Sequence, residues 1–135
     1  MNFSLQISEF VKTVKAREDI VVRKLGLDIL SSIVGKTPVD TGRARGNWQV
    51  GLNGPVTGQL ARLDKSGSVS IAAGNQVLSH AKAGGVIYIT NNVPYIRRLE
   101  YGWSKQAPAG MVRITLARFQ SMLNKAVAAA KAQVK

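Results

Sequence analysis

The sequence has 135 residues and no cysteine, and its 19 basic and 7 acidic side chains give a formal net charge of +12. This length fits a single domain with its own core, and the lack of thiols excludes disulfides, thiolate metal sites and cysteine nucleophiles. No run approaches the roughly 20 apolar residues of a membrane span or the apolar segment of a signal peptide. We therefore expect one soluble domain over residues 1–135, made in a cytoplasm and without membrane contact.

The first predicted element is a long amphipathic helix over residues 5–34. Its apolar positions recur at helical spacing: Ile7, Val11, Val14, Val22, Leu25, Ile29 and Ile33. Gly35 is placed to cap the helix and Pro38 bars its continuation. Gly26, inside the helix, predicts a slight bend or a close packing contact.

The segment 37–48 contains the tripeptide Asp-Thr-Gly, which is also found at the active site of aspartic proteases. Those enzymes share a proton between two carboxylates on strand-borne loops. Here Arg43 follows the tripeptide, where a fixed cation would keep Asp40 ionised, and the preceding element is a helix. A structural role is favoured, in which Asp40 caps a turn or short helix that extends through Arg45.

Three later segments are predicted to be strands of an antiparallel meander: residues 47–52, 68–73 and 86–90. The connection 53–67 has no readable pattern, and residues 74–85 are expected to form a flexible loop or a long hairpin tip. That loop holds His80, the only histidine, which we expect to be solvated because no cysteine or carboxylate lies near it.

After the last predicted strand, a short helix is expected from Pro94 to Tyr101, ended by Gly102. A final helix follows over residues 109–130. These elements predict an α+β fold, with a long N-terminal helix and a C-terminal helix packed on a small antiparallel sheet of three to four strands, and a short helix after the last strand.

The short helix and the loop after it concentrate residue types that favour protein interfaces: Tyr95, Arg97, Arg98, Tyr101 and Trp103. The alternative is that Tyr95, Leu99 and Trp103 cover the sheet as core. The two arginines fit that alternative poorly, because burying an unpaired charge costs several kcal/mol.

Motifs of the common catalytic classes are absent from the sequence. There is no GxGxxG, Walker A or HExxH pattern, and the carboxylates are too scattered to form a recognisable acid–base pair. We predict no catalysis, no cofactor and no metal site.

Four segments follow one another in an order that carries information about the family: Thr37–Arg45 after the first helix, then Ile89–Tyr95, Leu99–Gly102 and Gln106–Val112 before the last helix. Their order and spacing resemble the neck or tail-completion proteins of tailed bacteriophages, the minor tail component family that lies where the tail meets the head. The resemblance covers about residues 10–130. The loops 53–67 and 75–85 carry no matching motif.

The resemblance implies a structural virion protein that forms a homo-oligomeric ring on the head–tail axis and has no enzymatic activity. Its partners would be other copies of itself and the adjoining connector, neck or tail-tube proteins, with assembly in the cytoplasm of the host bacterium. The basic residues would face either genomic DNA in the channel or the acidic rim of an adjoining ring. A basic nucleic-acid-binding module is the alternative, although no reader motif or stacking platform is evident.

A ring needs interfaces in which one patch meets a different patch on the next copy. The subunit-interface candidates are Asp40, Arg43, Arg45, Tyr95, Arg97, Arg98, Glu100, Tyr101 and Trp103. Glu100 is the only acidic residue after Lys65, so we predict that it pairs with an arginine of the 43–45 turn, within or between subunits.

Overall fold

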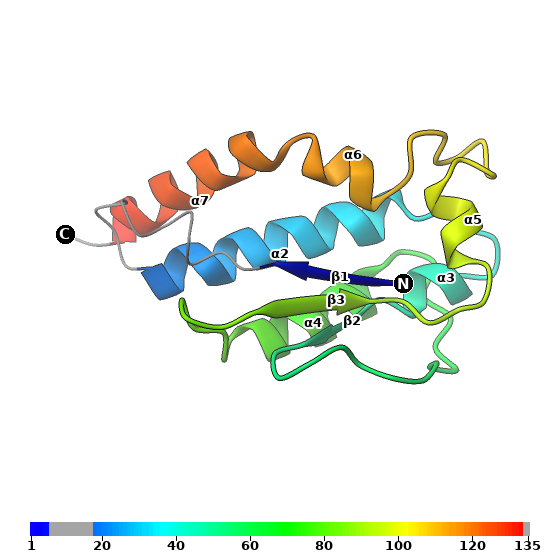
Figure 1. Ribbon diagram of the computed structural model, residues 1–135, viewed down its shortest axis with the longest axis horizontal. Helices are drawn as coiled ribbons and strands as arrows, with labels where there is room; N and C mark the ends of the chain where they lie inside the picture. The colour runs from blue at the N-terminus through cyan, green and yellow to red at the C-terminus, as the bar shows by residue number, and fades with distance from the viewer. Residues whose placement is uncertain (6–17, 134–135) are drawn as a thin grey trace.

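The computed structural model describes residues 1–5 and 18–133 and has the predicted α+β architecture. One long helix runs through the middle of the molecule, with the C-terminal helices along one side of it and a small sheet and a further helix on the other (Figure 1). In chain order the elements are β1 (Asn2–Leu5), α2 (Glu18–Lys36), α3 (Arg43–Gly46), β2 (Gln49–Gly51), α4 (Ser68–Leu78), β3 (Ile87–Thr90), α5 (Ile96–Glu100), α6 (Val112–Leu116) and α7 (Phe119–Gln133).

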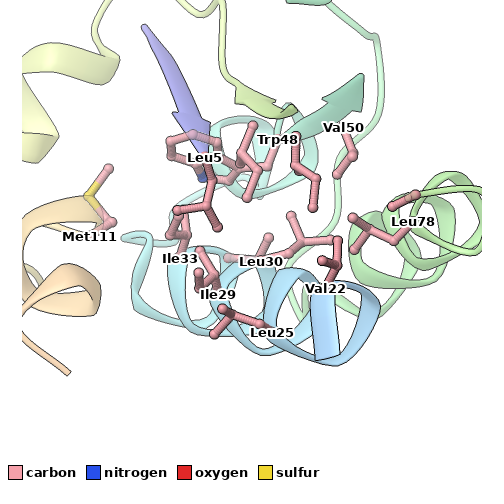
Figure 2. Close-up of a cluster of buried hydrophobic side chains, with 14 of the residues drawn as sticks. Leu5, Val22, Leu25, Ile29, Leu30, Ile33, Trp48, Val50, Leu78 and Met111 are labelled. Atoms are coloured by element: carbon pink, nitrogen blue, oxygen red, sulfur yellow. The ribbon is translucent and has the colours of Figure 1, made fainter. Parts of the chain in front are cut away.

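The central helix α2 supplies much of the core. The predicted positions Val22, Leu25, Ile29 and Ile33 are buried, and Figure 2 draws them in one cluster with Trp48, Val50 and Leu78 of other elements. Gly26 lies in a close part of this contact, where an added Cβ would be 3.0 Å from the Leu78 side chain. The close packing contact expected at Gly26 is therefore confirmed.

The predicted start of the first helix is wrong at Leu5, which belongs to strand β1. The rest of the predicted N-terminal half of that helix, including Ile7, Val11 and Val14, lies outside the described residues. The helix also ends slightly later than expected, at Lys36.

The sheet has three antiparallel strands in the order β1-β3-β2, so the predicted meander is wrong. Ile89 of the central strand faces Phe3 on one side and Val50 on the other. Strands β2 and β3 lie within the predicted segments 47–52 and 86–90. The third strand comes from the N-terminus instead of from residues 68–73.

Residues 68–73 were expected to form a strand and instead begin helix α4, which continues through part of the predicted 74–85 loop. The buried Asp64 carboxylate explains the difference, because it accepts the backbone N–H groups of Gly67 at 3.1 Å and Ser70 at 2.8 Å. It thereby satisfies donors that the first turn of a helix leaves free. Gly74 then lets α4 lie close against α2.

The predicted helix 109–130 is two helices, α6 and α7, separated by Ala117 and Arg118. The short α6 is held to α2 by a hydrogen bond of 2.7 Å between the hydroxyl groups of Ser32 and Thr115. Thr115 also bonds back to the carbonyl of Met111 at 2.7 Å, so it fixes the first turn of α6 internally as well.

Candidate interaction groove

The segment after α2 is a rigid turn because buried hydrogen bonds fix both of its ends. The Thr37 hydroxyl donates to the Ile33 carbonyl at 2.7 Å and accepts from the Trp48 indole at 2.8 Å. Gly42 has a φ of 89°, and a Cβ there would meet the Asp64 backbone at 2.7 Å. Only glycine fits this point without moving the backbone.

Arg45, an interface candidate, closes the same turn from inside. Its guanidinium donates to the backbone carbonyls of Thr37, Gly35 and Lys65, with the shortest contact of 2.7 Å to Lys65. These bonds use the arginine to join the end of α2 to the segment before α4. Arg45 therefore has a structural role within the subunit.

The α5 region is attached to this turn by Asn91, which follows the last residue of β3. Its side-chain amide donates to the Ala44 carbonyl at 2.8 Å and its oxygen accepts the Val93 N–H at 3.1 Å. No non-glycine residue in the described ranges has a positive φ. Asn91 therefore acts through hydrogen bonding and not through a left-handed backbone.

Gln106 completes the junction from the loop after α5. Its side chain accepts the Val39 N–H at 2.9 Å and donates to the Val39 carbonyl at 3.1 Å. Sequence reasoning missed this residue as a functional position, although it lies in one of the four segments that carried the resemblance. The side-chain amide thus pairs with both backbone polar groups of Val39.

A groove of about 410 Å³ lies between the turn after α2 and the region of α5. We call it the α5 groove; its lining residues are Pro38, Val39, Asp40, Thr41, Gly42, Arg43, Ala44, Tyr95, Leu99, Trp103, Ser104 and Gln106. The two parts of the sequence singled out for interaction thus meet at one site.

The aromatic residues at this site differ in exposure. Tyr95 is half-buried and Leu99 belongs to the core, as the alternative interpretation expected. Trp103 is 72% exposed and Tyr101 is 73% exposed, so neither covers the sheet. Both rings are available to a partner.

The arginines near the groove interact with aromatic faces or with solvent. The Arg43 guanidinium lies 5.7 Å from the centre of the Tyr95 ring and also bonds to Gln59. Arg97 and Arg98 are exposed, and within the described chain neither forms an ion pair.

Glu100 does not pair with Arg43 or Arg45 within the subunit, so the within-subunit form of that prediction is wrong. The carboxylate is 3% exposed and accepts the N–H groups of Met111, Val112 and Arg113 at 2.8 to 3.1 Å. It also forms an ion pair with the Arg113 side chain at 3.0 Å, and Arg113 lies over the Tyr101 ring at 5.0 Å.

The electrostatics of Glu100 follow from this environment. Burial alone would raise its pKa, but the hydrogen bonds from Val112, Arg113 and Met111 outweigh burial and hold the pKa below its ordinary value. The carboxylate is fully occupied inside the subunit. Its geometry is that of a structural anchor for α6 and leaves no oxygen facing a neighbour.

Asp40 is exposed and does not cap the following helix, contrary to the prediction. The Thr41 hydroxyl accepts the Arg43 N–H instead, at 3.2 Å. Among the residues that line the α5 groove, Asp40 is the only carboxylate. The shared-proton pair of an aspartic protease is therefore not formed by these groove residues.

Within residues 1–5 and 18–133, no group of three His, Asp or Glu side chains is arranged to hold a metal ion. His80 is exposed at the surface near Leu52 and Asn53, away from the α5 groove. None of the helices in the described ranges has both the length and the apolar character of a membrane span.

No protein-family model, curated protein or solved structure matches this chain.

Proposed function

We propose that the protein is a structural subunit of a tailed phage that completes the tail or joins it to the head by assembling into a ring. The observation that carries the proposal is a pair of exposed rings just after α5: Trp103, which lines the α5 groove, and Tyr101, two residues before it. Large aromatic side chains at the surface are typical of interface centres. Exposing both to water without a partner would be unfavourable.

The sequence segments behind the phage resemblance support the same proposal. Residues 38–42 line the groove, Asn91 ties the region of Tyr95 to the turn after α2, and Gly102 lies between the two exposed rings. Segments far apart in the chain thus build one surface at one end of the molecule (Figure 1). The proposed location is the virion neck or tail, with other copies and adjoining neck proteins as partners.

Assembly tests this function directly. We expect mass by light scattering to rise with protein concentration and negative-stain images to show closed rings. The double variant Tyr101→Ser/Trp103→Ser should weaken association at least about thirtyfold, the size of a hot-spot loss. Leu116→Ser is the matched control, because Leu116 is an exposed apolar residue on α6. Monomers at every concentration, or equal loss in the control, would contradict the proposal.

A basic nucleic-acid-binding module is the second candidate. It is favoured by one observation: from Lys65 to Gln133 the only acidic side chain is Glu100, and that side chain is buried and paired. The surface of this half of the chain therefore carries cations without acidic side chains. Such a surface attracts phosphate backbones as well as acidic proteins.

A further inference from the structure

The chain leaves β2 through a turn that contains Asn53 followed by Gly54, the only Asn-Gly dipeptide in the sequence. Asn53 is exposed and Gly54 is half-buried. The turn is tight, because a Cβ added to Gly51 would collide with the Gly54 carbonyl oxygen. Neither the Asn53 side-chain amide nor the Gly54 N–H forms a hydrogen bond with another described residue. No contact within the described chain therefore holds these two groups apart.

The two groups can react with each other. The Gly54 amide nitrogen loses its proton to solvent and attacks the side-chain Cγ of Asn53; the new N–Cγ bond forms, the bond from Cγ to the side-chain nitrogen breaks, and that nitrogen leaves as ammonia with a proton from solvent. Water then opens the cyclic succinimide at either carbonyl, which gives aspartate or isoaspartate. The net reaction consumes water and releases ammonia, so it needs no oxidant and no cofactor. Because both groups belong to one chain, the attack is intramolecular and has a high effective concentration.

Glycine after the asparagine is what makes this reaction accessible. It has no side chain to shield the attacking nitrogen, and its backbone can rotate into conformations that other residues avoid. Two other asparagines show the contrast. Asn91 is buried, and its side-chain amide is hydrogen-bonded through both the nitrogen and the oxygen. Asn75 is exposed, but it lies in helix α4 and is followed by Gln76.

We propose that Asn53 is a site of spontaneous deamidation, where the folded chain gains a carboxylate as it ages. Asn53 lines a hollow of about 330 Å³ together with His80 and Lys82. The new negative charge therefore appears next to a lysine and a histidine, and the formal net charge of +12 falls by one in each modified chain. Asn53 does not line the α5 groove, so the reaction does not depend on the proposed ring.

Ageing of the folded protein at mildly alkaline pH tests this site. Cation-exchange chromatography separates the chains that have lost a positive net charge, and the Asn53→Asp variant marks where they elute. Peptide mapping by mass spectrometry then locates the change. We expect Asn53 to be converted to a mixture of aspartate and isoaspartate, while Asn75, which is also exposed, stays intact.

Gly54→Ala is the matched variant. A Cβ at this position has no neighbour within 4 Å and Gly54 does not have a positive φ, so the fold accepts alanine. The added methyl group hinders the attacking nitrogen, and we expect the rate of deamidation to fall at least about tenfold, or about 1.4 kcal/mol in activation free energy. An intact Asn53 in the aged parent, an equal rate in Gly54→Ala, or equally fast deamidation at Asn75 would overturn the proposal.

Discussion

At the scale of single residues, Asp64 and Glu100 are buried carboxylates that each accept backbone N–H groups at the start of a helix. Asp64 binds the first turn of α4 and Glu100 that of α6, and each also accepts a side-chain donor, from Ser70 and Arg113 respectively. Neither helix begins with a side-chain cap of its own. Asp64, which precedes α4 in the chain, and Glu100, which belongs to α5, thus replace side-chain caps within these helices.

The pKa of both groups responds to two opposing effects. Burial raises the pKa of Asp64, but hydrogen bonds from the Ser70 backbone, the Ser70 hydroxyl and Gly67 lower it by more, so the net shift is downward. The pKa of Glu100 is lowered in the same way. Because the folded pKa lies below the unfolded one, the unfolded chain binds more protons in acid. The stabilisation is present above the unfolded pKa and is lost as the pH falls through the folded pKa.

We therefore predict that the free energy of unfolding falls as the pH is lowered below about 4, the ordinary range of these carboxyl groups. Urea unfolding at pH 7, 5, 4 and 3 measures it. At pH 7, Asp64→Asn and Glu100→Gln should each cost about 1–3 kcal/mol, since each leaves buried donors poorly paired. The double variant should show a shallower loss in acid.

Asp40→Asn is the control for this prediction, because Asp40 is exposed. Its unfolding free energy should stay within about 0.5 kcal/mol of the parent, with the same pH dependence. An unchanged acid slope in the Asp64→Asn/Glu100→Gln double variant would show that other groups carry the acid sensitivity.

At the scale of elements, α4 and α2 pack closely because α4 has a glycine where the two helices meet. A Cβ on Gly74 would lie 2.3 Å from the Leu30 side chain and 3.0 Å from that of Val50. Leu30 is fully buried, so its side chain has little room to move aside. The contact links α4 to both α2 and β2.

Two glycine-to-alanine changes should therefore have opposite signs. Gly74→Ala should destabilise the fold by about 1–3 kcal/mol, because overpacking outweighs the better helix propensity of alanine. Gly35→Ala should stabilise it by up to about 1 kcal/mol, since Gly35 is in α2 and a Cβ there has no neighbour within 4 Å. Thermal or urea unfolding compares them, and a stabilised Gly74→Ala would contradict the packing argument.

The elements that the sequence predicted well are those with a local signal. The apolar stripe of α2, the β-branched run of β3 and the stop at Gly102, whose φ is 86°, all lie where the pattern placed them. The error at α4 arose because Val69 and Ile71 alternate as in a strand, whereas the deciding contact comes from Asp64, outside the predicted segment. Alternation over a few residues does not distinguish a short strand from a helix whose first turn is capped by a carboxylate outside the segment.

The candidate site was predictable in composition and not in geometry. The crowding of Tyr101 and Trp103 could be read from the sequence. The partner of Glu100 could not, because Arg113 is separated from it by a loop whose path depends on tertiary packing. Asn91 and Gln106 were overlooked for the same reason, since each bonds to backbone about 50 to 70 residues away.

At the scale of the whole molecule, the acidic side chains of the described chain lie within residues 18–40, apart from the buried Asp64 and Glu100. Helix α2 carries Asp28, which pairs with Lys24 at 3.0 Å and so neutralises part of its own charge. Helix α7 has no acidic residue, and Lys125 and Lys131 are exposed on it. Helix α7 lies along one side of α2 (Figure 1), and both lysines are exposed to solvent.

We predict that this surface binds duplex DNA without sequence preference, and that the affinity falls as a power of the salt concentration. Each phosphate contact contributes about 0.9 to the slope of log affinity against log salt. Lys125→Gln/Lys131→Gln should therefore reduce that slope by nearly 2 and weaken binding at low salt. Fluorescence anisotropy with a labelled duplex between 50 and 300 mM salt measures both effects.

Lys24→Gln is the matched control for the DNA prediction, because it removes a lysine whose charge is already met by Asp28. It should leave the slope nearly unchanged, although it alters the net charge by half as much as the α7 double variant. Equal slope changes per lysine would mean that only total charge matters. If rings form and the α7 variants lose DNA affinity without losing assembly, these lysines bind DNA and do not contribute to the subunit interface. If they lose assembly and keep DNA affinity, the lysines of α7 contact a neighbouring copy of the chain in the ring.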